Sequence, residues 1–326
     1  MKPLYIWAGG KNKMIPKYQE NPGIPYSGYD TFVEPFFGGG AMMIHIYQNA
    51  PQVKRFIMND VNPEIVGIYR AIKNDLQNFL TKMDALQSAY LPLNKVDRKK
   101  FYYDLRKEYT TNWTQWNATD ESATLYFLMK TGFNGIWQVN QQSNGRFATP
   151  SGLLDQKIKV YDKDNVLAWN VFLQRVDIYC GDWSACTQSV EGKAFYFMDP
   201  PYRDSFTQYG QSFDDNAHIK LIDFCKQEDA NGNYVYYCNR DAGDDFYDVN
   251  RGQLVEATYP ITYTAGRRKQ SKDDEGNVVS HAAKAATEIL LYSPVIDTLN
   301  CKIVKSTTKS KKKSKTVDIS GFVEIS

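Results

Sequence analysis

The chain is poor in the residues that build metal centres and disulfide frameworks. Its three histidines, His45, His218 and His281, are scattered and have no metal-ligand spacing. Its five cysteines are odd in number, form no C-x-x-C pair and in several cases lie in apolar runs, so we expect reduced, buried thiols. No apolar stretch is long enough to span a membrane, and MKPLYIWAGG has no signal-peptide pattern. We therefore expect a cytoplasmic protein that needs no metal.

An excess of charge of one sign is also absent. The 39 basic and 37 acidic residues leave a net charge of +2, so the overall charge does not indicate a polyanionic partner. Two local patches are basic: TAGRRK (264–269) in a long polar loop, and a low-complexity C-terminal segment with seven lysines between positions 302 and 315. Such runs are usually solvated, and the alternative is that they contact a polyanion.

Short apolar runs alternate with segments of helical periodicity. The helix that we expect at 62–76 opens with Asn62 as a cap and Pro63 at the first helical position. The alternation predicts an α/β fold with a mostly parallel sheet covered on both faces. The last two strands lack a helix between them, so we expect an antiparallel pair at the sheet edge. The expected strands are 31–35, 54–60, 176–180, 194–198, 234–238, 254–259 and 287–292, and the other expected helices are 41–50 and 214–229.

The alternation stops between about residues 76 and 165. This segment is polar, aromatic and rich in Asn and Gln, and we expect an inserted second domain that is helical at first and then loop-like. With 326 residues the chain is long enough for two domains of ordinary size. The predicted division is therefore 1–75 and 166–300 for the main domain, 76–165 for the insert and 301–326 for a lysine-rich tail.

The stretch FVEPFFGGG (32–40) follows an expected strand and precedes an expected helix. Its glycines let the backbone approach a ligand closely, and the N-terminus of the following helix favours polar or anionic groups. No GK[ST] follows, so it is not a P-loop, and it does not match G-x-G-x-x-G, which weakens an NAD assignment. Asp60 ends the next strand, where a carboxylate can accept hydrogen bonds from ribose hydroxyls. Each feature alone also fits a turn or a helix cap, but their order favours a nucleoside-containing cofactor.

WAGGK (7–11) lies before the first expected strand. A Trp, two glycines and a Lys at this place fit a segment that closes over the cofactor from outside the sheet. The alternative is an N-terminal arm that packs its Trp on the domain.

FMDPPYRD (197–204) follows the strand-like run AFYFM. Its two prolines cannot donate backbone hydrogen bonds, so they end regular pairing. What remains is a stiff loop that holds the Asp199 carboxylate and the Tyr202 ring at the end of a strand, where ligands bind in open α/β sheets. The alternative is a strand followed by a proline turn.

Five motifs, in this order, resemble a known family. WAGGK, FVEPFFGGG, IMND, GFNG and DPPY make the chain similar, from about residue 5 to 292, to the Dam-like N6-adenine DNA methyltransferases that carry a target-recognition insert before DPPY. The resemblance implies a Rossmann-like methyltransferase fold: a mostly parallel seven-stranded sheet with an antiparallel edge pair, plus an inserted, mainly helical target-recognition domain. It also implies S-adenosylmethionine as the cofactor and double-stranded DNA as the substrate, in a bacterial cell or as a phage-encoded enzyme.

The resemblance further implies how the DPPY residues act. The adenine amino group is a poor nucleophile, and the Asp199 carboxylate with the Pro200 carbonyl can accept hydrogen bonds from both of its N–H groups. Tyr202 can stack on the base once it is flipped out of the duplex. Pro200 and Pro201 stiffen the loop, so the acceptors are preorganised. This chemistry needs neither a metal nor a covalent intermediate, and Asp199 is too weak a base to deprotonate the amine first.

For the cofactor, the family pattern carries over to residues in the first three motifs: Trp7, Ala8, Gly9, Lys11, Glu34, Pro35, Phe36, Gly38 and, for the ribose, Asp60. The pattern also places an acidic residue beside the cofactor's adenine, after the strand at 176–180. Asp182 is the candidate there, with Trp183 as a wall. The alternative is that Asp182 only caps a turn.

Residues 128–152 resemble the family's DNA-reading hairpin. Phe133 and Asn134 lie where the family inserts side chains into the base stack or fills the gap left by the flipped base. Pro150 matches a proline at the far end of the segment.

The hairpin departs from the pattern of the GATC-methylating enzymes at one position. Those enzymes carry an Arg two residues after an apolar residue, here Ile136, but this chain has Gln138 there. Arg suits the two acceptors of guanine and Gln suits adenine, so the recognition sequence is expected to differ from GATC. The alternative is that another side chain, with Lys130 as the candidate, takes over the guanine contact.

Three further segments lie where the family meets DNA. YCNRD (237–241) would border the pocket for the base, and Arg267, Arg268 and Lys269 are candidates for phosphate contacts, which position the protein without specifying a sequence. The lysine-rich tail would add DNA affinity that falls with salt, and the alternative is an inert tail.

Three other functions remain open beside DNA adenine methylation. An RNA or protein-amide methyltransferase would share the chemistry, a DNA-binding module would have lost it, and an NAD-dependent oxidoreductase would explain only the glycine-rich loop. The recognition sequence, a cognate restriction endonuclease as partner, and the oligomeric state are not given by the sequence.

Overall fold

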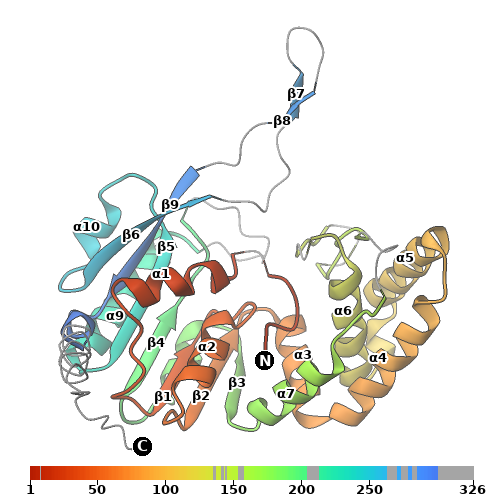
Figure 1. Cartoon of the computed structure of the whole chain (residues 1–326), viewed down its shortest axis with the longest axis horizontal. Helices are drawn as coiled ribbons and strands as arrows, with labels where there is room; N and C mark the ends of the chain where they lie inside the picture. The colour runs from red at the N-terminus through yellow and green to blue at the C-terminus, as the bar shows by residue number, and fades with distance from the viewer. Residues whose placement is uncertain are drawn as a thin grey trace, which may run out of the picture.

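A seven-stranded sheet forms the centre of the molecule (Figure 1). In this computed structural model the strand order is β3-β2-β1-β4-β5-β9-β6. Strands β1 to β5 run parallel, and β9 lies antiparallel between β5 and β6. The predicted α/β fold, with an antiparallel pair at the sheet edge, is therefore confirmed. The strands are β1 (Thr31–Glu34), β2 (Arg55–Asp60), β3 (Val176–Cys180), β4 (Ala194–Met198), β5 (Tyr234–Arg240), β6 (Val255–Thr262) and β9 (Ala285–Tyr292).

The structure describes most of the chain, with gaps. The described ranges are 1–7, 9–134, 137–140, 143, 145–152, 158–203, 213–262, 270–272, 278–280 and 285–299. Within them a small separate pair, β7 (Gln270–Lys272) and β8 (Val278–Ser280), is antiparallel.

Helices cover both faces of the sheet, as the sequence alternation predicts. The expected helices are present as α2 (Ala41–Asn49), α3 (Pro63–Asn74) and α9 (Asp215–Ala230). Asn62 caps α3 by accepting hydrogen bonds from the backbone N–H groups of Glu64 and Ile65, and Pro63 occupies the first turn. The remaining elements around the sheet are η1 (Lys11–Lys13), α1 (Ile15–Glu20), α7 (Lys163–Leu173), α8 (Trp183–Thr187) and α10 (Phe246–Asn250).

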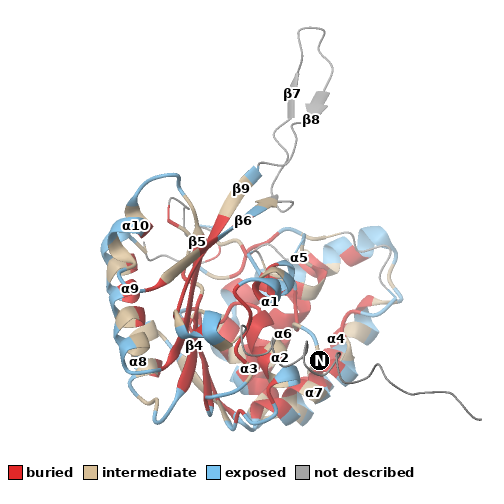
Figure 2. Ribbon diagram, turned by 60° about the vertical axis from the view of Figure 1, so that its left-hand side comes forward, coloured by how far each residue is buried: buried red, intermediate tan, exposed pale blue. Residues whose placement is uncertain are grey.

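Neighbouring residues along each central strand belong to different hydrophobic cores. Phe195 and Phe197 of β4 pack in the core shared with α1, α2, α3 and α7, whereas Tyr196 and Met198 pack in the core shared with α8, α9 and α10. Side chains alternate between the two faces of a strand, so an unbroken apolar run fills both cores. Figure 2 shows the result: the central strands are buried, and exposed residues lie on the outer faces of the helices.

The segment expected as an insert begins with helices and continues as loop. Helices α4 (Leu76–Tyr90), α5 (Lys95–Thr111) and α6 (Ala118–Thr131), with the short η2 (Trp113–Gln115), stand beside α3 and α7 at the right of Figure 1. Their buried aromatic side chains are continuous with the core under the sheet. The domain boundaries at 76 and 165 stay a prediction.

The expectation that the cysteines are buried free thiols is confirmed at three positions and is wrong at a fourth. Cys186, Cys225 and Cys238 are buried free thiols, but Cys180 is exposed. Cys180 ends β3, which is an edge strand of the sheet, so the apolar run VDIYC is only partly covered. Cys301 lies outside the described residues. None of the described helices combines the length and the apolar character needed to cross a membrane.

Candidate active site

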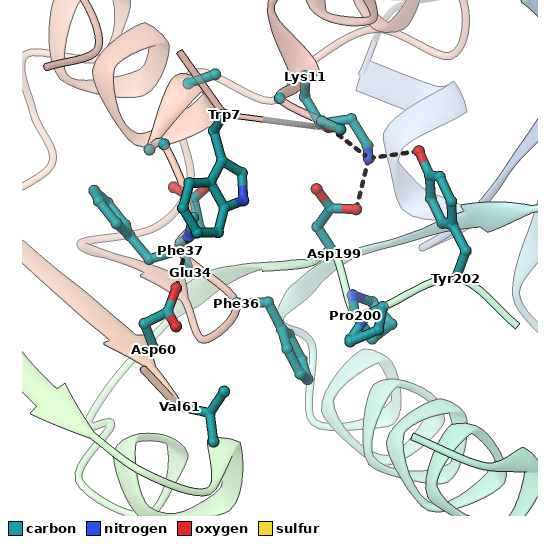
Figure 3. Close-up of a pocket in the computed structure, with 17 residues that line it drawn as sticks. Trp7, Lys11, Glu34, Phe36, Phe37, Asp60, Val61, Asp199, Pro200 and Tyr202 are labelled. Carbon is teal, nitrogen blue, oxygen red and sulfur yellow. Dashed lines mark hydrogen bonds and ion pairs between the residues drawn. The ribbon is translucent and has the colours of Figure 1, made fainter. Parts of the chain in front are cut away.

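A pocket opens where β1, β2 and β4 end (Figure 3). Glu34 and Asp60 are the last residues of β1 and β2, and Asp199 follows β4 directly. The carboxyl ends of neighbouring parallel strands meet at one edge of the sheet, so three carboxylates separated in sequence share one cavity. The lining residues are Trp7, Gly9, Gly10, Lys11, Glu34, Phe36, Phe37, Gly38, Gly39, Gly40, Ala41, Asp60, Val61, Asp199, Pro200, Pro201 and Tyr202.

The glycine loop between β1 and α2 forms one wall of the pocket. Gly38 and Gly40 have backbone φ angles of 50° and 64°, which residues with a Cβ rarely adopt. A Cβ on Gly38 would lie 2.6 Å from the indole nitrogen of Trp7, and a Cβ on Gly40 would collide with the Phe37 ring. The glycines are therefore required both by the turn and by the Trp7 ring that lies against it.

Glu34 and Asp60 are buried and held by backbone amides. Glu34 accepts a hydrogen bond from Met43 N at 2.9 Å. Asp60 accepts from Gly38 N and Asn62 N, both at 2.9 Å. Burial raises the pKa of both carboxyls, and the amide hydrogen bonds offset part of the rise. These bonds fix the carboxylates in place at the strand ends.

Lys11, Asp199, Tyr202 and Glu288 form a cluster at the other end of the pocket, which we name the Lys11 cluster; Lys11 and Glu288 are buried, and Asp199 and Tyr202 are half-buried. The ammonium of Lys11 lies 2.6 Å from Asp199 Oδ1 and 3.2 Å from Glu288 Oε1. It also donates to the Tyr202 hydroxyl at 3.3 Å, and that hydroxyl donates to Glu288 Oε2 at 3.1 Å. Figure 3 shows Lys11 reaching both Asp199 and Tyr202.

The charges in the Lys11 cluster shift one another. Burial raises the pKa of Asp199 to about 6, Lys11 opposes this rise, and Glu288 adds to it. Burial lowers the pKa of Lys11, but the attraction of Asp199 and Glu288 outweighs burial and leaves that pKa well above its ordinary value. The lysine is therefore a fixed cation between two carboxyl groups.

Glu288 is a site residue that the sequence reading missed. It lies in β9, within the apolar run TEILLY, and is 1% exposed. Tyr18 donates to its Oε1 at 3.4 Å and to Cys238 Sγ at the same distance. An ionisable residue inside an otherwise apolar strand was the available signal, because such a residue is rarely buried without a partner.

The DPPY loop (199–202) is fixed from behind by β5. Asn239, which is fully buried, donates from Nδ2 to the carbonyl of Pro201 at 3.4 Å and accepts from Arg203 N at 3.1 Å. YCNRD (237–241) thus lies behind the loop: Asn239 contacts the loop directly, whereas Cys238 accepts a hydrogen bond from Tyr18, which also contacts Glu288.

Arg203 anchors the same loop to α9. Its guanidinium binds Asp215 through two hydrogen bonds, at 2.8 and 3.1 Å, and Asp244 through two at 3.0 Å. It also stacks over Phe246, 3.9 Å from the ring centroid. Paired, two-pronged contacts of this kind hold the end of the loop in one orientation.

Three of the residues predicted for the cofactor do not line the pocket. Pro35 turns its carbonyl toward Asn59, which donates to it at 3.0 Å. Asp182 is exposed and caps α8 by accepting from Ser184 N at 2.9 Å, which is the turn-capping alternative. Trp183 packs on Phe224 in the second core. Ala8 lies outside the described residues.

The predicted DNA-reading segment folds back on itself in antiparallel fashion. Isolated bridges join Gly132 to Ser151 and Val139 to Phe147, and Ala148 N donates to the carbonyl of Gln138 at 2.7 Å. Phe133, Asn134 and Pro150, which the sequence analysis singled out in this segment, lie within the described residues.

Phe133 is exposed, and its N–H donates to the carbonyl of Pro150 at 2.9 Å, next to the bridge between Gly132 and Ser151. Asn134 has a positive φ of 51°. Asn tolerates that conformation better than most residues, so the backbone turns sharply here. Ile136, Arg267, Arg268, Lys269 and the tail at 301–326 lie outside the described residues.

The N-terminal arm joins this segment to the pocket. Trp7 lines the pocket and packs on Trp137, with ring centroids 6.1 Å apart. Tyr126 and Lys130 of α6 both donate to the carbonyl of Leu4, at 3.2 Å. The alternative in which the Trp packs on the fold therefore holds, and the same Trp lines the cavity; that the segment closes over a cofactor stays a prediction.

A family model of D12 class N6 adenine-specific DNA methyltransferases matches residues 7–256. The chain belongs to this family. It is similar to the type II methyltransferase M.MjaIII of Methanocaldococcus jannaschii, with 30% identity over 283 residues that cover 84% of this chain and 95% of that protein. It is also similar to the type II methyltransferases M1.LlaDCHI of Lactococcus lactis subsp. cremoris, 27% identical over 79% of this chain and 88% of that protein, and M.CviBI of Paramecium bursaria Chlorella virus NC1A, 30% identical over 69% and 79%.

The family membership, together with the Rossmann-like methyltransferase topology of the sheet, confirms the resemblance drawn from the five motifs. The protein is an enzyme that methylates adenine at N6 in DNA in a site-specific manner. As a methyltransferase it uses a methyl donor, and its substrate is DNA. Among the described residues no group of three or more His, Cys, Asp and Glu side chains is arranged to hold a metal ion.

Proposed function

We propose that the pocket binds S-adenosylmethionine and that the DPPY loop receives the target adenine, flipped out of double-stranded DNA. The observation that carries this proposal is the meeting of two features in one cavity. The glycine loop with Glu34 and Asp60 lies at one end, and the Asp199 carboxylate with the Pro200 carbonyl lies at the other. A methyl donor and its acceptor must lie side by side, and a single cavity that contains both features supports this proposal.

The first end of the cavity fits a nucleoside-containing donor. Each oxygen of the Asp60 carboxylate accepts one hydrogen bond from a backbone amide and has a lone pair left, so each can still accept a hydrogen bond from a ribose hydroxyl. The glycines let the indole of Trp7 lie directly against the loop, so that the loop and the indole together form an apolar wall for a ligand. When bound, S-adenosylmethionine supplies an activated methyl group on a sulfonium centre.

At the other end, Asp199 and Pro200 provide two acceptors for the two N–H groups of the amine. These hydrogen bonds hold the amine in place and raise electron density on nitrogen as it gains the methyl group and positive charge. Tyr202 provides a stacking face for the flipped base. The loop needs little reorganisation, because Asn239 and Arg203 hold it in place.

We also propose that the helical insert and the segment after it read the DNA sequence. Phe133 and Asn134 lie at an exposed turn, where side chains can enter the base stack. The half-buried Gln138 lies on the same folded-back segment, and its amide suits adenine better than guanine. The recognition sequence is therefore proposed to differ from GATC. Arg267, Arg268 and Lys269 are proposed to contact phosphates.

The names of the relatives support a role beside a restriction endonuclease. Three are type II methyltransferases, whereas a fourth is the retron Ec67 DNA adenine methylase of Escherichia coli, 23% identical over 84% of this chain and 90% of that protein. We propose a cognate restriction endonuclease that cuts the same sequence. Genomic DNA from a host expressing this protein should resist that nuclease and remain sensitive to others.

The reaction and its site can be tested together by expressing the protein in a host that lacks adenine methylation. Long-read sequencing should find N6-methyladenine within a single short motif. The variant Asp199→Ala should show no methylated motif while still binding S-adenosylmethionine in calorimetry. Methylation by this variant at the wild-type level would remove Asp199 from the chemistry.

A further inference from the structure

Glu288 is the one member of the Lys11 cluster that lies far from the five sequence motifs. It comes from β9, beyond residues 7–256 that match the family model. Its carboxylate is buried, and its two oxygens have different partners. Oε1 faces Lys11 and Tyr18, whereas Oε2 accepts from the Tyr202 hydroxyl.

The Lys11 ammonium presents a difficulty for the reaction. It lies 2.6 Å from Asp199 Oδ1, and Asp199 is the proposed acceptor for the adenine amino group. When the amine takes that oxygen, the contact between Lys11 and Asp199 weakens. Lys11 is 4% exposed, and a buried ammonium without a counter-charge is costly. A second carboxylate beside the ammonium removes that cost while adenine is bound.

Glu288 meets that need without moving. It already lies 3.2 Å from the ammonium, and apart from Asp199 and Glu288 no Asp or Glu among the described residues makes an ion pair with Lys11. Its second oxygen holds the hydroxyl of Tyr202, whose ring would stack on the base. The Glu288 carboxylate therefore contacts both Lys11 and Tyr202, the two side chains that must adjust when adenine binds.

We infer that Glu288 is a positioning residue for methyl transfer. It shares the Lys11 ammonium with Asp199, so adenine can take Asp199 without leaving a buried cation unpaired. The same carboxylate orients Tyr202 for stacking. This inference rests on the proposed role of Asp199 as the acceptor for the amine.

The pH dependence of the rate reports this arrangement, because Glu288 and Asp199 are coupled. Glu288 adds to the rise in the pKa of Asp199 that burial begins. Removing the Glu288 charge therefore lowers the pKa of Asp199 and moves the acidic limb of the rate profile to lower pH. The titratable groups that face Asp199 are Lys11 of η1, Tyr18 of α1, Glu34 of β1, Tyr202 of its own loop, Cys238 of β5 and Glu288 of β9.

The test compares Glu288→Gln with Glu288→Asp in the full-length enzyme. Gln keeps an oxygen for the Tyr202 hydroxyl but removes the charge that holds Lys11, whereas Asp keeps the charge on a shorter side chain. Glu256→Gln is the matched control. It is the same substitution on the neighbouring strand β6, where Glu256 faces Arg251 at 4.0 Å and has no contact with Lys11. Each variant is assayed on unmethylated genomic DNA with S-adenosylmethionine across pH 5 to 8.

We expect Glu288→Gln to lower kcat about tenfold, less than the loss of a direct transition-state contact, and to shift the acidic limb to lower pH. Affinity for S-adenosylmethionine should be unchanged, Glu288→Asp should recover most of the rate, and Glu256→Gln should match the wild type. If Glu288→Gln does not fold, Glu288→Met removes the same charge on a side chain of similar length: a slower enzyme with its acidic limb at lower pH supports the inference, and a folded enzyme with the wild-type rate and limb overturns it.

Two results would overturn the inference directly. One is a Glu288→Gln enzyme with the wild-type kcat and acidic limb. The other is a rate loss that follows the loss of folded protein and that Asp does not restore. An inactive wild-type enzyme under the same conditions is a different failure, because it would count against the proposed function itself.

Discussion

The indole ring of Trp7 packs on the ring of Trp137, with centroids 6.1 Å apart and planes inclined at 47°. Trp7 lines the pocket, and Trp137 directly precedes Gln138 in the folded-back segment. A single aromatic contact thus joins the wall of the proposed cofactor site to the residue proposed to read a base. The proposed cofactor site and the proposed DNA-reading segment therefore adjoin each other, although Trp7 and Trp137 are far apart in the sequence.

The first prediction tests this contact. Trp137→Leu should weaken the binding of S-adenosylmethionine about fivefold, even though Trp137 does not line the pocket. The reason is that Trp7 loses an aromatic partner, and such pairs contribute about 1 kcal/mol beyond simple burial. Isothermal titration calorimetry of the enzyme without DNA measures the change. Trp113→Leu is the control, since Trp113 lies on η2 and has no contact with Trp7; equal effects in the two variants would contradict the prediction.

The second prediction concerns pH. The acceptor role of Asp199 requires the ionised carboxylate, and burial raises its pKa to about 6. The carboxyl therefore gains a proton as the pH falls through about 6, and kcat/KM should fall about tenfold per unit below that point. Lys11 stays charged throughout, because its pKa lies well above the ordinary value. A rate profile at constant ionic strength that is flat between pH 5 and 8 would show that Asp199 does not have to be ionised.

The third prediction concerns the glycine loop. Gly38→Ala should weaken S-adenosylmethionine binding at least tenfold, because Gly38 has a positive φ and its new Cβ would press on the Trp7 indole. Affinity should fall much more than the thermal melting temperature. Gly145→Ala also has a positive φ but an empty space around its Cβ, so it controls for backbone strain alone. If both variants bind the donor normally, the loop does not form the wall of the cofactor site.

The fourth prediction concerns sequence recognition. Gln138→Arg should shift or relax the preference at one base pair, because Arg offers two donors to guanine where Gln pairs with adenine. A good two-pronged base contact is worth about 1–3 kcal/mol of discrimination, so the change should be visible in the methylated motif. Sequencing of methylated genomic DNA from expressing cells gives the profile. Lys130→Met is the parallel variant, and an unchanged profile in Gln138→Arg together with a changed one in Lys130→Met would move the readout to Lys130.

The sheet and the pocket were predictable from the sequence because they depend on local signals. Apolar runs ending in Glu34, Asp60 and Asp199 mark strands, and the carboxyl ends of parallel strands must share an edge. Pro63 after Asn62 marks the start of α3 in the same local way.

The features that the sequence did not reveal depend on register between distant strands. Glu288 reaches Lys11 only because β9 runs antiparallel beside β5, with Glu288 paired to Arg240. Nothing within TEILLY shows which side chain points to the pocket. The expectation that Cys180 is buried was wrong for the same kind of reason, because its exposure depends on β3 being an edge strand of the sheet.

The position of β9 has a consequence for how the enzyme is made. β9 is the last strand of the described chain, yet it lies between β5 and β6, and β6 pairs with no other strand of the large sheet. A chain emerging from the ribosome releases Lys11 long before Glu288, so β6 has no neighbour in the large sheet to pair with until residues 285–292 have been synthesised. A nascent chain, or one terminated before residue 288, therefore lacks the carboxylate that holds Lys11, and the complete Lys11 cluster forms only after β9 has been synthesised.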